Sequence, residues 1–153
     1  MRTKASFFVI LILLLSPFLG GVAFAQVQVR VRVMEASNVG SGFDSSLRDL
    51  HDQLGSLFSF SSYRLLKDET VSLSLNQPVS LPIPPERSLE LTFINQNRVT
   101  AEIRVKITRS GRDLLTTLVR LAPGRSVSIG GPNPKRGEGT IITALSRPKP
   151  IQE

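Results

Sequence analysis

Asp49, His51 and Asp52 form the most compact group of side chains that could do chemistry. At about 100° per residue on a helix, the two carboxylates share one face and His51 lies at its flank. Three such groups could hold a weakly bound cation, but a zinc site needs a further histidine or a cysteine, and the chain has one histidine and no cysteine. We therefore expect a solvated helix face here, with no bound metal.

Nucleophilic and acid-base catalysis find little support elsewhere in the sequence. No serine lies in a G-x-S-x-G elbow, and the lack of cysteine excludes thiol chemistry. The 12 acidic residues are scattered, and Asp68 and Glu69 are the only adjacent pair. An enzyme would need a site assembled from distant carboxylates, with Asp49, His51 and Asp52 as the first residues to substitute. We expect no enzyme and no cofactor.

Basic residues are the next candidates, with a binding face as the alternative to the ordinary interpretation, surface charge scattered for solubility. Arg30 and Arg32 occupy alternate positions of one predicted strand, on the side opposite its apolar residues. Arg104 and Lys106 do the same on a second predicted strand. If the two strands were neighbours, one sheet face would be a cationic platform for an anionic partner. No aromatic residues interleave these cations, so stacking on nucleic-acid bases is not predicted.

A second cationic feature is the loop from Gly130 to Gly139, which is rich in glycine and proline and carries the adjacent Lys135 and Arg136. Exposed backbone N–H groups beside two cations could bind an anion. The loop lacks the G-K-[ST] ending of a phosphate-binding Walker motif, so a nucleotide site is not predicted. The candidate residues for an anionic partner are Arg30, Arg32, Arg104, Lys106, Lys135 and Arg136.

The elements that position these side chains are mainly strands. Residues 27–33 alternate apolar and polar types without a break, which is typical of a half-buried strand. Similar runs, bounded by residues that favour turns, predict the other strands at 58–66, 71–75, 79–83, 89–93, 99–107, 114–121, 127–129 and 140–145. Among the expected turns are those at 67–69 and 95–97.

One short amphipathic helix is expected over residues 44–54. Asp44 is a suitable N-cap, leucines recur at helical spacing, and Gly55 suits the C′ position. About eight or nine short strands with one helix predict a mostly β fold, either a β-sandwich or a partly closed barrel. We assign it to one domain over residues 26–146. Residues 147–153, which include two prolines, are expected to form a disordered tail.

Residues 1–25 have the organisation of a cleavable signal peptide. Two cations precede an apolar run from Phe7 to Leu15, and a small-residue cleavage site ends at Ala25. Cleavage between Ala25 and Gln26 would remove two of the 19 basic residues and none of the 12 acidic ones, lowering the formal net charge from +7 to +5. We expect a periplasmic or secreted protein. The alternative is a retained membrane anchor, because residues 5–25 carry no charge and are just long enough to span a bilayer.

The stretch from Leu121 to Gly131 combines a Pro-Gly turn, a short alternating strand and a Gly pair. It resembles a strand motif of secretins, the outer-membrane gates of secretion systems and type IV pili. This resemblance implies an accessory role in such a system. The chain after residue 25 as a whole resembles small exported bacterial β-rich proteins, a similarity that implies no activity.

Together these observations predict a non-enzymatic, exported binding or structural module of the bacterial cell envelope. The expected partner is an envelope protein or an anionic envelope polymer rather than nucleic acid. A membrane is expected as a partner only if the signal segment is retained. Two alternatives stay open, namely an accessory protein of a secretion or pilus system and an enzyme whose site combines distant carboxylates.

Overall fold

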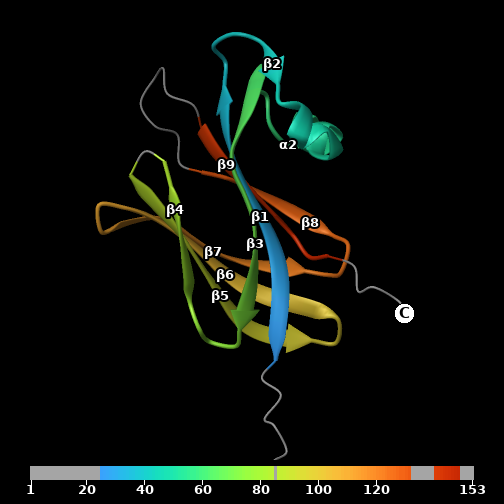
Figure 1. Ribbon diagram of the computed structural model, residues 1–153, viewed down its shortest axis with the longest axis vertical. Helices are drawn as coiled ribbons and strands as arrows, with labels where there is room; N and C mark the ends of the chain where they lie inside the picture. The colour runs from blue at the N-terminus through green and yellow to red at the C-terminus, as the bar shows by residue number, and fades with distance from the viewer. Residues whose placement is uncertain (1–24, 85, 132–139, 149–153) are drawn as a thin grey trace, which may run out of the picture.

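Two sheets pack face to face, and β1 and β3 of the first cross in front of the second in Figure 1. The computed structural model describes residues 25–84, 86–131 and 140–148. The five-stranded sheet has the order β2 (Gly42–Phe43), β3 (Ser62–Ser74), β1 (Gln26–Ser37), β9 (Thr140–Ser146) and β8 (Ser126–Gly130). The four-stranded sheet has the order β4 (Val79–Ile83), β5 (Arg87–Asn97), β6 (Thr100–Arg109) and β7 (Arg112–Leu121). The predicted mostly β, sandwich-like fold is confirmed.

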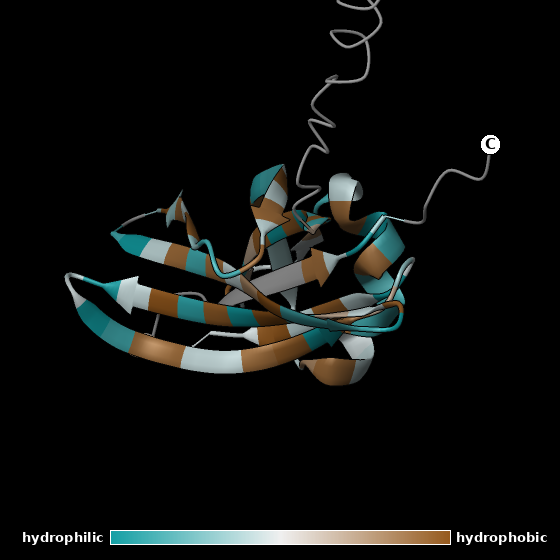
Figure 2. Cartoon of the chain, turned by 90° about the horizontal axis from the view of Figure 1, so that it is seen from below, coloured by the Kyte–Doolittle hydropathy of each residue, from teal (hydrophilic) through white to brown (hydrophobic). Residues whose placement is uncertain are grey.

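Side-chain alternation explains why the two sheets pack together. The four valines at alternate positions of β1, from Val27 to Val33, are at most 2% exposed. They share one core with Leu89, Leu91 and Phe93 of β5, all of which are fully buried. Figure 2 shows the resulting bands of apolar and polar residues along the strands. Burial of one face of each sheet therefore sets the register of the sandwich.

A second, smaller core lies on the outer face of the five-stranded sheet. It is covered by a 3₁₀ helix, η1 (Ser45–Leu50), and by α2 (His51–Leu57). Its buried members are Met34, Ala36, Leu47, Leu50, Leu54 and Tyr63. Among the described residues, no helix is both long and apolar enough to cross a membrane. The predicted signal peptide lies outside them up to Phe24.

The predicted helix over residues 44–54 is correct in position and in its buried leucines, but not in form. Asp44 is the N-cap, and its Oδ1 accepts a hydrogen bond from the Ser46 N–H at 3.0 Å. The first part is a 3₁₀ helix, and α2 continues through Gly55 to Leu57. The helix ends only where Phe58 becomes extended, since this residue packs against the second core. Gly55 therefore does not occupy the predicted C′ position but lies inside the helix.

The turn predicted at residues 67–69 is wrong, because these residues lie inside β3. β3 pairs with β1 along its whole length, with a register shift that pairs Val33 with Lys67 but Met34 with Leu65. Leu66 is thus the extra residue of a bulge. The two strands predicted at 58–66 and 71–75 are one strand, which begins at Ser62. The charged residues were misread as a turn because their partners lie on a distant segment.

The turn between β5 and β6 also differs from the predicted position at residues 95–97. β5 continues to Asn97, and the turn is formed by Arg98, at φ +55°, and Val99. The turn thus lies at residues 98–99, and the hairpin also has a bulge at Ile94, where the register shifts between Phe93 and Asn95. Val99 is consequently 62% exposed instead of lying in a strand.

Arg147, the first residue of the expected tail, is hydrogen-bonded to the turn before β8. The Arg147 N–H donates to the Arg125 carbonyl at 3.2 Å, and the Arg147 carbonyl accepts from the Gly124 N–H at 2.8 Å. These bonds continue the contact of β9 with the turn before β8. Residues 149–153 lie outside the described part of the chain. The secretin-like stretch from Leu121 to Gly131 forms the end of β7, this turn and β8.

The turn between β6 and β7 gives a first testable prediction. Ser110 and Gly111 have φ values of +50° and +76°, as a two-residue hairpin turn requires. Substitution of Gly111→Ala should lower the free energy of unfolding by about 1 kcal/mol, because a side chain disfavours this conformation. Gly55→Ala is the control, since alanine in a helix should instead raise stability by about 0.5–1 kcal/mol. If urea unfolding showed that both substitutions change the free energy of unfolding in the same direction, this account of the turn would be wrong.

Candidate functional site

The cationic platform predicted from the sequence does not form. Arg30 and Arg32 lie on β1 in the five-stranded sheet, whereas Arg104 and Lys106 lie on β6 in the four-stranded sheet. The apolar residues of both strands point into the shared core, so these cations point to opposite outer faces of the sandwich. The strands oppose each other across the core, which no local sequence pattern could reveal.

Arg30 and Arg32 are instead bound to carboxylates. The Arg30 Nε and Nη2 donate to the two carboxylate oxygens of Asp68 at 2.9 and 2.7 Å. The Arg32 Nη1 donates to Asp49 Oδ1 at 2.7 Å. The Arg32 side chain is only 4% exposed beneath η1, so its predicted solvent exposure is wrong. The two ion pairs attach η1 and β3 to the central strand.

These contacts fix the charge of both carboxylates. The hydrogen bond from Arg32 lowers the pKa of Asp49 below its usual value, and the hydrogen bond from Arg30 does the same for the pKa of Asp68. Both groups are therefore ionised at neutral pH and already hold their hydrogen-bond donors. Asp49 connects two elements of the fold and is not simply part of a solvated helix face.

His51 and Asp52, the rest of the predicted catalytic group, contact each other, whereas Asp49 contacts Arg32. The Asp52 Oδ1 lies 3.2 Å from the His51 Nδ1, and both side chains are largely exposed. The His51 ring packs edge-on against Phe43 with centroids 4.8 Å apart. Within the described ranges, no group of three potential ligands is arranged around a metal position.

The other predicted binding residues are distributed over separate surfaces. Lys106 Nζ lies 3.3 Å from Asp113 Oδ1 on the outer face of the four-stranded sheet. Arg104 is exposed on the same face and has no ion pair with any residue that the structure describes. Lys135 and Arg136 lie outside the described residues.

The structure brings together three arginines that were not singled out in the sequence. Arg87 pairs directly with Arg109 across β5 and β6, and Arg109 pairs directly with Arg112 across β6 and β7. Directly opposed residues share one sheet face, so the three side chains form a row across adjacent strands. We call this set the arginine row. The β4–β5 connection and the β6–β7 turn, which flank it, lie on the same side of the molecule in Figure 1.

The arginine row lies at one end of the main core. Arg87 has the same strand parity as Leu89 and Leu91, so it points between the sheets. It is only 9% exposed, and its Nε and Nη1 are buried without a hydrogen-bond partner among the described residues. Arg109 and Arg112 are exposed. Nothing in the part of the chain that the structure describes forms an ion pair with the row.

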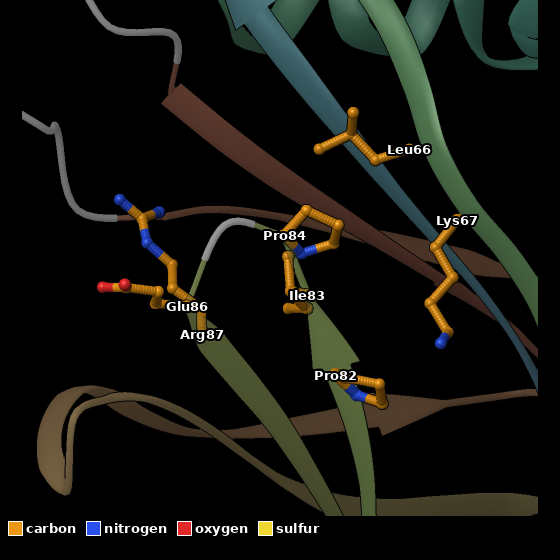
Figure 3. A pocket seen from close by; sticks show the side chains of 7 residues that line it. All are labelled: Leu66, Lys67, Pro82, Ile83, Pro84, Glu86 and Arg87. Carbon is orange, nitrogen blue, oxygen red and sulfur yellow. The ribbon is translucent and has the colours of Figure 1, made fainter.

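A broad pocket of about 410 Å³ adjoins Arg87. Its lining comprises Leu66 and Lys67 of β3, the β4 end from Pro82 to Pro84, and Glu86 and Arg87. Lys67 and Arg87 lie on opposite sides of the β4 end, as Figure 3 shows. Both cations therefore line a pocket whose centre is formed by proline and aliphatic side chains.

The electrostatics of this end are unfavourable in the absence of an anion. Like charges at directly opposed strand positions destabilise a sheet. A buried guanidinium without a partner costs several kcal/mol, because the protein interior replaces its hydration poorly. A bound anion would offset both costs, which makes the arginine row the candidate binding surface.

The fold and this site define a β-sandwich with a basic, partly buried end. No family model matches the chain, and no curated protein or solved structure matches it. The sequence held one usable signal for the row: Arg109 and Arg112 flank a Ser-Gly turn, where hairpin residues face each other.

Proposed function

We propose that the chain is a non-enzymatic, exported binding module of the bacterial cell envelope that holds an anionic partner at the arginine row. The partner is an anionic envelope polymer, an envelope lipid or the acidic surface of an envelope protein. The observation that carries this proposal is the alignment of Arg87, Arg109 and Arg112 on three adjacent strands without an ion-pair partner among the described residues. Export rests on the signal-peptide pattern of residues 1–25.

The chemistry of the carboxylates favours binding over catalysis. A general acid or base works best with a pKa near the working pH. The pKa values of Asp49 and Asp68 are shifted in the opposite direction, below their usual range, by arginine hydrogen bonds. These groups are therefore suited to structural ion pairs and poorly suited to exchange protons at neutral pH.

A binding experiment with a matched control tests the proposal. The chain from Gln26 onward should bind polyphosphate and polyglutamate at low salt, with an affinity that falls as salt rises. The triple variant Arg87→Gln, Arg109→Gln, Arg112→Gln should lose at least about tenfold in affinity. The control triple variant Arg48→Gln, Arg98→Gln, Arg125→Gln removes the same charge from exposed positions elsewhere, and should change affinity by about twofold at most. Affinities are measured by calorimetry. Equal losses of affinity in both variants would show that binding depends on net charge alone and not on the arginine row.

Export is tested separately, with the protein expressed with its own N-terminus in a bacterial host. A soluble species beginning at Gln26, identified by intact mass in the periplasmic or culture fraction, is the expected result. An uncleaved species in the membrane fraction would contradict export by cleavage and would identify residues 5–25 as an anchor.

A further inference from the structure

We infer that the pocket beside Arg87 binds the phosphate group of a phosphate monoester. This inference rests on the proposed function and narrows its ligand from anions in general to one chemical class. The phosphate can be carried by a membrane lipid or by a soluble molecule, and the two sources share the same recognition chemistry.

The need for an anion follows from the burial of Arg87. Its Nε and Nη1 are covered and have no hydrogen-bond partner among the described residues, and the side chain lines the pocket. A ligand in the pocket reaches these two nitrogens only when the flexible Arg87 side chain turns toward it. A guanidinium has N–H donors and no acceptor, so only an acceptor can satisfy it. A neutral acceptor such as water would complete the hydrogen bonds but leave the charge uncompensated. An oxyanion supplies both the acceptor atoms and the compensating negative charge, and its hydrogen bonds are about twice as strong as neutral ones.

The surrounding charges favour a phosphate monoester over a carboxylate. Arg109 follows Arg87 in the row, and Lys67 lines the pocket opposite it. A phosphate monoester carries a charge of about −1.5 to −2 near pH 7 and has three strongly accepting oxygens. It can therefore accept from Arg87 and from a second cation, whereas a carboxylate has a single charge and two oxygens. Glu86 also lines the pocket and repels any anion, but the cations Lys67 and Arg87 outnumber it there.

The apolar part of the lining suits the carbon skeleton that carries such a phosphate. Pro82 lies in β4, Pro84 directly follows this strand, and Leu66 of β3 lines the same pocket (Figure 3). None of the described residues that line this pocket is aromatic, so they offer no stacking platform for a nucleobase. At about 410 Å³ the space falls within the size range of small-molecule sites. An aliphatic or sugar phosphate fits these walls best.

Thermal unfolding of the chain from Gln26 onward tests this inference with inorganic phosphate as the probe. Phosphate should raise the Tm relative to acetate and chloride at matched ionic strength, because a ligand of the folded state stabilises it. Arg87→Gln should abolish the phosphate-specific rise, and Arg98→Gln should retain it. Arg109→Gln, at an exposed position, should weaken phosphate binding about three- to tenfold without loss of the fold. The Arg109→Gln variant therefore still tests the phosphate site if Arg87→Gln does not fold.

The outcomes separate this inference from the function on which it rests. Equal stabilisation by acetate, or no effect of phosphate in a protein that still binds polyglutamate, would overturn the phosphate site and leave anion binding intact. Failure to bind polyphosphate and polyglutamate as well would overturn the proposed function. Cosedimentation with phosphatidylcholine vesicles containing phosphatidic acid, but not phosphatidylglycerol, would support a lipid phosphate. A phosphate-dependent Tm without vesicle binding would support a soluble phosphate monoester.

Discussion

Replacement of Phe93 with alanine is expected to lower the free energy of unfolding by about 3–5 kcal/mol. Phe93 is fully buried on β5 and belongs to the main core. Its backbone also joins the two sheets, because Leu75 forms an isolated bridge with it and the Asn76 N–H donates to its carbonyl at 2.7 Å. Removal of the ring leaves a cavity that this fixed backbone cannot close. The loss would be a large part of the 5–15 kcal/mol by which a domain is usually stable.

Urea unfolding measures this effect, with Leu118→Ala as the matched control. Leu118 is also an apolar strand residue, but it lies on the outer face of β7 and is 50% exposed. Its substitution should change the free energy of unfolding by about 0.5 kcal/mol or less. If the two variants lost similar amounts, Phe93 could not belong to a tightly packed core between the sheets.

Substitution of Asp49→Asn should lower the free energy of unfolding by about 1–3 kcal/mol. The change leaves the Arg32 guanidinium, only 4% exposed, without its carboxylate. Breaking a fully buried ion pair costs about 3–5 kcal/mol, and the smaller value reflects the Asp49 side chain, which is 59% exposed and screened by water. Asp52→Asn removes the same charge three residues away from a fully exposed side chain, so it should leave stability almost unchanged.

The effect of Asp49 should also depend on pH. The Arg32 hydrogen bond lowers the pKa of Asp49 in the folded state below its unfolded value of about 3.9. The stability that this pair contributes is therefore present above pH 4 and is lost as the pH falls through the lower, folded pKa. The difference between wild type and Asp49→Asn should be constant from about pH 6 to 8 and should shrink near about pH 3. If the difference in stability between wild type and Asp49→Asn stayed the same at low pH, the ion pair would not be its cause.

The sequence predicted those features that depend on neighbouring residues. The valines of residues 27–33 are buried as their alternation indicated, and Asp44 caps η1. Features that depend on distant partners were missed. Residues 67–69 look like a turn in isolation but continue β3, because the long strand β1 pairs with them. Arg32 looks exposed by alternation, but η1 covers it and supplies Asp49.

The candidate site shows the same division. Arg30, Arg32, Arg104 and Lys106 were chosen because alternation places them on polar strand faces, yet three of them form ion pairs and the two strands belong to different sheets. The arginine row depends on the register of three strands. Arg87 and Arg109 are 22 positions apart in the chain, and only the pairing of β5 with β6 places them side by side.

The position of β1 in its sheet has a consequence for the order in which the chain can fold. β1 is the first strand of the described domain, and it lies between β3 and β9, the last. Because a chain is synthesised from its N-terminus, β1 keeps one unpaired edge until residues 140–146 have been added and can pair with it. Pairings this far apart in sequence form slowly. The sheet therefore closes only after residues 140–146 have been synthesised, and until then the free edge of β1 is accessible to chaperones that bind unfolded chains.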